Sequence, residues 1–250
     1  MRSINIRTWE VRLGIALVLS SIIVYTVKYL LLGDPENTYH YIFNALGFLP
    51  INVLLVTLIL NHLLSVREKR KRLEKLNMVI GTFFSEVGTG LLAFLSDRDP
   101  ALPEIRHDLI VTDVWTPEKF STVRERSRRR HFRLNIDAAD LQELCRYLTE
   151  KRGFLLQLLE NPVLLEHESF TELLRAVFHL TEELERRGDF AALPASDVGH
   201  LAGDVDRVYD RLTGEWLAYM EYLQRNYPYL FSLAMRSNPF DETASPIVRV

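Results

Sequence analysis

Two short stretches of the 250-residue sequence carry residue types that could bind a metal ion. "FHLTEEL" begins at residue 178 and "GHLAGDV" at residue 199, and each places a carboxylate four residues after a histidine: His179 with Glu183, and His200 with Asp204. Four residues is about one turn of an α-helix, so both side chains of a pair lie on one helix face. Imidazole and carboxylate groups are common ligands of zinc and iron. The spacing therefore predicts that each pair could direct two ligands at one ion.

The expected orientation of these pairs argues against a metal site. At about 100° per residue, His179 lies roughly 160° from the seam residue Val177, and His200 lies roughly 140° from Val205. Metal sites in helical bundles need inward-pointing ligands. The spacing resembles that of hemerythrin-type proteins, but the remaining histidine ligands of that family are not matched. We therefore expect solvated faces with local ion pairs and no bound metal; a helical-bundle metal-binding enzyme using the four side chains is the alternative.

No other motif predicts catalysis. The sequence contains no GxxxxGK[ST], no CxxC, no HExxH, no GxSxG and no GxGxxG after a strand. Cys145 lies beside Leu144 and Leu148 in a helical pattern, where a small buried residue is expected. We expect a non-enzymatic protein without a cofactor.

The apolar residues gather near the N-terminus and predict two membrane spans. Residues 13–32 and 41–64 are long apolar runs, and about 20 helical residues cross a hydrocarbon core. The segment between them, "GDPENTYH", contains turn formers and acids. A cleaved signal peptide would have a shorter apolar part and a small-x-small cleavage site. The sequence therefore predicts a transmembrane hairpin in residues 1–66.

The basic residues predict the orientation of this hairpin. Arg2, Arg7 and Arg12 precede the first run, the connecting segment has no Lys or Arg, and "VREKRKRLEK" follows the second run. Because an excess of Lys and Arg stays on the cytoplasmic side, we expect both termini inside and a multi-pass protein of the cell inner (plasma) membrane. The single cysteine, Cys145, suits a reducing compartment.

Residues 67–99 predict a helix that continues from the second span. An apolar seam follows it at steps of three or four residues, with two four-residue steps in succession at its centre. Small side chains at Gly81, Ser85 and Thr89 would allow another helix to come close. Two interpretations stay open: an oligomerisation stalk, or a helix packed on its own chain's domain. A third span over residues 77–96 is a further alternative, which Glu86 at its middle disfavours. The seam consists of Leu73, Leu76, Ile80, Phe83, Val87, Leu91 and Phe94.

Residues 100–240 predict a cytoplasmic all-α bundle, followed by a polar tail over 241–250. Thr116 before Pro117 and Asp137 before an apolar helix indicate helix starts, and Ser169 with Glu172 forms a capping box for a helix that Gly188 ends. A long helix follows "LPASD", and Pro228 begins a short one. The aromatic segment "NYPYLFSLAMRSNPF" is expected to dock over the core. The fold class is all-α: a transmembrane helical hairpin, a long cytoplasmic helix and a helical bundle.

Two basic groups are candidate contacts for anionic lipid or an acidic partner. The chain is acidic overall and has no recognised nucleic-acid-binding fold, so nucleic acid is not an expected partner. The candidates are Arg67, Lys69, Arg70, Lys71, Arg72 and Lys75 after the second span, and Arg124, Arg126, Arg128, Arg129, Arg130 and Arg133 in the bundle.

The polar residues of the second run favour helix packing over a pore. With Asn44 set at 0°, Asn52 lies near 80°, Thr57 near 220° and Asn61 near 260°, so the polar groups form no single stripe, as a water-filled channel would require. We expect Asn52 and Asn61 to hydrogen-bond between helices. An oligomeric channel is the second alternative function.

Together with the C-terminal aromatic segment, "FLPINVLLVTLILNHLL" resembles a group of prokaryotic two-span membrane proteins that have a cytoplasmic helical domain and no assigned activity. The resemblance implies no substrate or ligand. We expect an oligomeric membrane protein whose cytoplasmic domain serves interaction or sensing, with the lipid bilayer, further copies of the chain and a cytoplasmic protein as partners.

Overall fold

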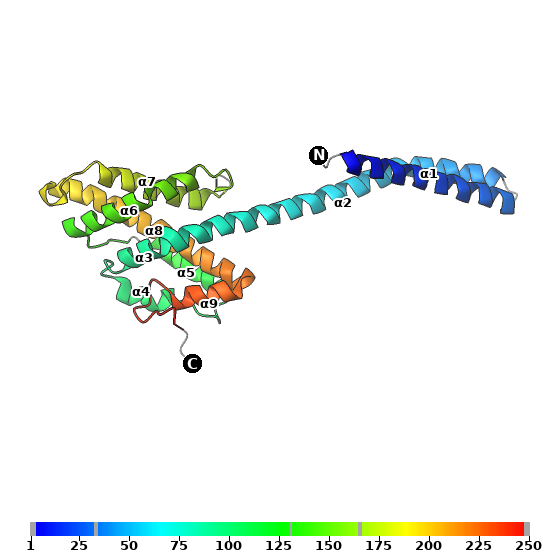
Figure 1. Ribbon diagram of the computed structural model, residues 1–250. Helices are drawn as coiled ribbons and strands as arrows, with labels where there is room; N and C mark the ends of the chain where they lie inside the picture. Colours follow the sequence, from blue (N-terminus) through cyan, green and yellow to red (C-terminus); the bar gives the residue numbers. More distant parts are fainter. Residues whose placement is uncertain (1–3, 33–34, 131, 165–166, 248–250) are drawn as a thin grey trace. The chain divides into compact units, whose positions relative to one another are not determined.

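The described part of the chain is entirely helical. The structure is a computed structural model that describes residues 4–32, 35–130, 132–164 and 167–247. No strand occurs in these ranges, which confirms the all-α class. The elements shown in Figure 1 are α1 (Ile4–Leu32), α2 (Pro35–Phe83), a π-helical turn (Phe84–Gly88), α3 (Thr89–Ser96), α4 (Leu102–Leu109), α5 (Pro117–Arg129), α6 (Ala138–Leu159), α7 (Glu168–Glu185), a 3₁₀ turn (Phe190–Ala192), α8 (Ala195–Asn226) and α9 (Pro228–Arg236).

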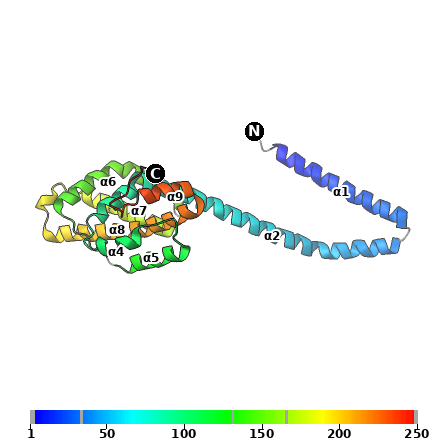
Figure 2. The same ribbon diagram turned by 90° about the horizontal axis from the view of Figure 1, so that it is seen from below.

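The contacts divide the chain into two units, Met1–Glu68 and Lys69–Val250. In the first unit, α1 and the start of α2 meet near their connection, where the rings of Tyr25 and Tyr41 lie 6.3 Å apart and the Lys28 ammonium lies 4.8 Å from the Tyr41 ring. Figure 2 shows the two helices joined at this end. Their described apolar side chains are exposed almost throughout, so this unit has no core of its own. Arg2 lies outside the described residues.

Within the described residues, one helix is long and apolar enough to cross a membrane, and it covers Tyr39–Ser96. Its apolar window has a mean hydropathy of 2.1, and none of the window is buried. Ile15–Leu30 forms a shorter apolar helix. The expected pair of spans at 13–32 and 41–64 therefore stays a prediction.

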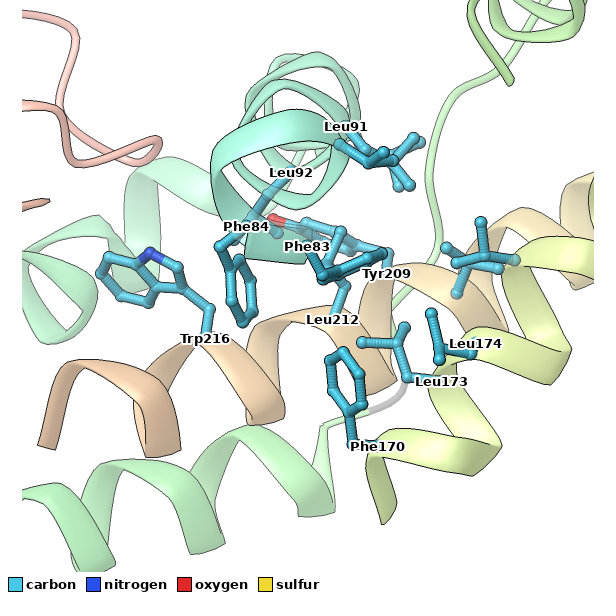
Figure 3. Close-up of a cluster of buried hydrophobic side chains, with 14 of the residues drawn as sticks. Phe83, Phe84, Leu91, Leu92, Phe170, Leu173, Leu174, Tyr209, Leu212 and Trp216 are labelled. Atoms are coloured by element: carbon cyan, nitrogen blue, oxygen red, sulfur yellow. The ribbon is translucent and has the colours of Figure 1, made fainter. Parts of the chain in front are cut away.

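The second unit contains the core, and the end of the long helix belongs to it. Phe83, Val87 and Leu91 are fully buried, and Leu76 and Ile80 are nearly so, whereas Leu73 is 46% exposed. The seam therefore packs on its own chain's domain from Leu76 onward. Figure 3 shows Phe83 and Leu91 among side chains of α7 and α8.

The π-helical turn explains how the uneven seam stays buried. Phe83, Val87 and Leu91 are separated by two successive four-residue steps, which in a regular α-helix would rotate the apolar positions off the seam. The turn Phe84–Gly88 lies at these steps. A π turn holds more residues than an α turn, so it absorbs the extra rotation. Val87 in this turn also accepts a 2.9 Å hydrogen bond from the Tyr147 hydroxyl through its carbonyl oxygen.

Small residues on this helix admit two tyrosines of the same chain. A Cβ at Gly81 would lie 3.0 Å from the Tyr219 hydroxyl, and one at Gly90 would lie 2.8 Å from the Tyr147 hydroxyl. Of the three small residues expected to admit another helix, Gly81 does so for α8, whereas Ser85 is exposed; Gly90, which was not among them, admits α6. Since residues 77–96 carry several fully buried apolar side chains of this unit, they act here as a domain helix.

The long helix α8 is the centre of the bundle. It packs on α7, α5, α3 and α9, while α6 packs on α7. Its buried side chains include Val205, Tyr209, Leu212 and Trp216. Figure 3 shows Tyr209 and Leu212 in the same cluster of buried side chains as Phe83 and the α7 residues Leu173 and Leu174.

Two of the expected helix starts are confirmed. The Thr116 side chain accepts a hydrogen bond from Lys119 N, and Asp137 forms a capping box with Asp140. The long helix after "LPASD" and the short helix from Pro228 are confirmed as well.

The expected bounds of α7 were wrong. His167, not Ser169, is the N-cap residue, because its ring Nδ1 accepts a hydrogen bond from Phe170 N at 3.2 Å. The helix ends at Glu185, before Gly188, and a short-range bond from Arg187 N to Leu184 O at 3.1 Å closes its last turn. Histidine is not among the residues preferred at helix N-caps, so the sequence did not indicate this helix start.

The C-terminal aromatic segment docks over the core in part. Phe240 is 1% exposed and makes an edge contact with Trp216, at 5.2 Å between ring centroids. The buried Asn238 donates a 3.1 Å hydrogen bond to Leu109 O of α4, a helix that the sequence did not predict. Tyr229 stays 71% exposed.

Candidate functional site

The first basic group lies on an exposed part of α2. Its six Lys and Arg residues are exposed, and the same stretch contains two acids, Glu68 and Glu74. Arg70 and Glu74 form an ion pair at 3.3 Å, both well exposed. Exposed pairs of this kind contribute little stability. The segment therefore keeps a positive excess available to an anionic surface.

The second basic group does not form one positive face. Arg124 binds Glu221 at 2.8 Å, Arg126 binds Asp108, and Arg129 binds Glu125 at 3.0 Å. Arg130 lies 3.6 Å from Glu104 and donates to Ala101 O, and Arg133 lies close enough to Asp206 to influence its ionisation. Most of the charge that the sequence grouped together is thus matched within the chain.

Arg128 lines a polar hollow of about 630 Å³ between α5, α8 and the residues at the start of α7. Arg207 and Arg211 also line it, and Arg211 binds Glu172 at 3.3 Å. Glu125, Asp210 and Glu215 contribute carboxylates to the same wall. The hollow is therefore mixed in charge and has no strong preference for an anion.

The two His-x-x-x-carboxylate pairs meet at the contact between α7 and α8. His179 Nε2 and His200 Nε2 each lie 3.6 Å from Asp204 Oδ2. His200 Nε2 also lies 3.9 Å from Glu183 Oε2. The packing of two helices thus gathers all four residues that the sequence placed as separate pairs.

Burial distinguishes Asp204 from its neighbours. Its side chain is 4% exposed, against 49% for His179 and 55% for His200. The outward direction of the histidines matches the helical-wheel expectation, but Asp204 lies inside the helix contact. Arg207 binds Asp204 Oδ1 at 2.7 Å, whereas Asp204 Oδ2 is buried and has no hydrogen-bond partner among the described residues.

Arg187 binds two carboxylates next to the histidines. It binds both oxygens of Asp197 at 2.6 and 2.7 Å and the Glu183 carboxylate at 2.8 Å. These hydrogen bonds lower the pKa of Asp197 and of Glu183. The i, i+4 pair of Glu183 and Arg187 was visible in the sequence, but the bond to Asp197 depends on how the chain turns from α7 into α8. The expected local ion pairs are thus present.

In their present rotamers these side chains do not surround one point. Across the described ranges, no group of three or more His, Cys, Asp and Glu side chains is arranged to hold a metal ion.

The expected intramembrane packing residues lie on α2. Asn52 and Asn61 are both exposed. Within the described residues, neither side chain makes a hydrogen bond. The structure therefore shows no partner for these two amide groups.

Comparison with known proteins identifies relatives over nearly the whole chain. Residues 72–236 match the family described as "Uncharacterized protein MJ1433, C-terminal helical domain", and residues 4–64 match "MJ1433, N-terminal helical domain". The chain belongs to the MJ1433 family. "Uncharacterized protein MJ1433" of Methanocaldococcus jannaschii is 44% identical over 237 residues, which is 95% of each chain. No solved structure matches. The sequence resemblance to a prokaryotic family with helical domains is confirmed, while its membrane nature stays a prediction.

Proposed function

We propose that this MJ1433-family protein is an integral membrane protein whose N-terminal helical hairpin anchors a cytoplasmic helical domain for interaction or sensing. The domain acts without catalysis of its own, and the protein works as a homo-oligomer. Both termini lie in the cytoplasm.

The observation that carries the proposal is the uncovered apolar surface of the first unit. An apolar window of mean hydropathy 2.1 in the helix Tyr39–Ser96 has no buried residue. Large apolar side chains such as Phe43, Leu54 and Leu60 are 80%, 58% and 52% exposed. Soluble monomers rarely leave a continuous apolar surface of this extent uncovered. A lipid bilayer would surround the helix completely, and the apolar side chains are distributed around the whole helix.

The charges next to this surface favour a cytoplasmic domain. The exposed Lys and Arg residues from Arg67 to Lys75 directly follow the apolar part of α2, and they outnumber the acids there by six to two. Such a segment is retained on the cytoplasmic side and is attracted to anionic headgroups, at about 1 kcal/mol per basic residue near the surface.

The oligomer is assigned to the hairpin and not to the helix beyond Leu76. The seam from Leu76 to Leu91 is buried by its own chain, so it has no surface left for another copy. Asn52 and Asn61 are exposed and offer amide groups within the apolar surface. In a bilayer, a second copy of the same helix can satisfy them, and each such hydrogen bond contributes about 0.6 to 2 kcal/mol.

The test is the partition and assembly of the full-length protein in cells. We expect it to stay in the membrane pellet after an alkaline carbonate wash and to crosslink as an oligomer. Release by carbonate would contradict the anchor. A strictly monomeric but pelleted protein would contradict only the oligomer.

A further inference from the structure

We propose that His179, His200 and Asp204 bind one divalent transition-metal ion of the Zn²⁺ type at the contact between α7 and α8. This site is independent of the membrane anchor, because it rests on side chains of the second unit alone.

The unpartnered Asp204 oxygen carries the inference. Asp204 is 3% exposed, and its Oδ2 accepts no hydrogen bond from the described residues although Oδ1 is bound by Arg207. A buried carboxylate oxygen without a partner is strongly unfavourable, and most buried polar atoms in proteins are satisfied. Two histidine nitrogens lie 3.6 Å from this oxygen, which is too far for a hydrogen bond. A cation between these atoms would satisfy the oxygen.

The two distances from Asp204 Oδ2 to the histidine nitrogens are close to those between ligands of one metal ion, although the three side chains do not converge on one point in their present rotamers. Zn²⁺ binds nitrogen and oxygen at about 2.0–2.2 Å, so two ligand atoms at a tetrahedral angle lie roughly 3.3–3.5 Å apart. The observed separations of 3.6 Å are slightly larger than this. Both imidazole rings are about half exposed, whereas Asp204 is buried, so coordination requires the rings to turn toward the carboxylate. The ion itself would gather the rings around one point.

The surrounding charges favour a cation. Glu183, Asp197 and Asp204 provide three carboxylates against the two guanidinium groups of Arg187 and Arg207. Arg187 directs its hydrogen bonds to Asp197 and Glu183, and Arg207 binds Asp204 Oδ1, so neither guanidinium group donates a hydrogen bond to Asp204 Oδ2. By binding Oδ1, Arg207 holds the Asp204 carboxylate in an orientation that leaves Oδ2 for the ion.

The ligand set selects the class of ion. Two imidazole nitrogens with one carboxylate oxygen suit zinc, iron, nickel or copper, whereas magnesium and calcium prefer oxygen ligands alone. Glu183 lies near enough to His200 to serve as a fourth ligand or to hold its ring. No reaction is assigned to the site.

The test is titration calorimetry of the purified full-length protein, without a histidine tag, with ZnCl₂. We expect one Zn²⁺ per chain, and we expect His179→Ala, His200→Ala and Asp204→Asn each to weaken binding at least tenfold. MgCl₂ should give no binding heat. His107→Ala is the matched control, because His107 is 97% exposed and lies outside the group. Cys145→Ala serves as the background, since a thiol can bind zinc by itself.

Replacing Zn²⁺ with Co²⁺ gives a readout of the ligands that does not depend on affinity. We expect visible absorption bands in the wild type that are lost in His179→Ala and kept in His107→Ala. Circular dichroism establishes that each variant is folded. Absence of zinc binding in the wild type, or equal binding by the folded His179→Ala, His200→Ala and Asp204→Asn proteins, would overturn the proposal.

Discussion

Replacement of Phe83 by alanine tests whether the end of the long helix is part of the domain core. Phe83 is fully buried and makes edge contacts with Phe84 and with Phe170 of α7, at 5.4 and 5.3 Å between ring centroids. The substitution removes the ring and leaves a cavity where the helix meets the bundle. Both effects lower the free energy of unfolding of the domain.

The expected loss follows from the burial. Phe→Ala substitutions at fully buried sites cost about 3–5 kcal/mol through lost transfer energy and the remaining cavity. The two edge contacts place Phe83→Ala in the upper half of that range, because such aromatic pairs contribute about 0.5–1.5 kcal/mol beyond their buried area. In a domain of this size, a loss of about 4–5 kcal/mol corresponds to a fall in Tm of roughly 8–20 °C.

The assay is urea unfolding of the full-length protein in detergent, followed through tryptophan fluorescence, to which the core residue Trp216, 2% exposed, contributes. Met78→Ala is the matched control, because Met78 is on the same helix but is 71% exposed. Its substitution should change the free energy of unfolding by about 0.5 kcal/mol or less.

Two results would refute this reasoning. Equal effects of Phe83→Ala and Met78→Ala would show that the helix end is not part of the core. A Phe83→Ala loss that varies with protein concentration would assign the seam to an oligomerisation stalk, since subunit dissociation depends on concentration and the unfolding of one chain does not.

Three further predictions follow from other contacts. Tyr147→Phe removes the hydrogen bond to the π-helical turn and should lower the free energy of unfolding by about 0.5–1.5 kcal/mol in the same urea assay, because this contact between α6 and the turn is lost; an unchanged midpoint would contradict this. The pKa values of Asp197 and Glu183 are lowered by Arg187 from ordinary values of 3.8 and 4.5, so the stability they contribute is present above about pH 4.5 and is lost as the pH falls through their folded pKa values. Arg187→Gln should therefore lower the urea midpoint at pH 7 and have less effect at pH 3, and an equal effect at both would exclude the linkage. Finally, the purified protein should conduct no ions in planar bilayers, and Asn52→Leu should weaken crosslinking without changing permeability; currents that vanish in Asn52→Leu would favour a channel.

The sequence predicted those elements whose signals are local. The all-α class, the start of α5 after Thr116 and the start of α6 after Asp137 depend on periodicity and capping within a few residues. The start of α7 was missed because His167 caps it through a ring nitrogen, which residue preferences at helix caps do not single out. The two successive four-residue steps of the seam around Val87 could be read from the sequence. The π turn that keeps these positions buried could not, because it depends on packing against other helices.

The candidate site shows the same limit. Helical-wheel positions placed His179 and His200 outside the apolar seams, as the structure has them. They could not show that α7 faces α8 along this line, and that packing buries Asp204 and brings the four side chains together. The arginines from Arg124 to Arg133 are adjacent in sequence, yet their partners on other elements divide them. Long-range pairing decides such cases, and no single-sequence pattern encodes it.

Site-directed cysteine labelling tests the membrane anchor and its orientation most directly. In a Cys145→Ala background, Glu36→Cys places a thiol between the two apolar runs and Val114→Cys places one on the domain, where Val114 is 79% exposed. With a membrane-impermeant maleimide, we expect Glu36→Cys to be modified in intact cells and Val114→Cys only after the cells are permeabilised. Modification of Val114→Cys in intact cells, or protection of Glu36→Cys until permeabilisation, would contradict the proposed topology.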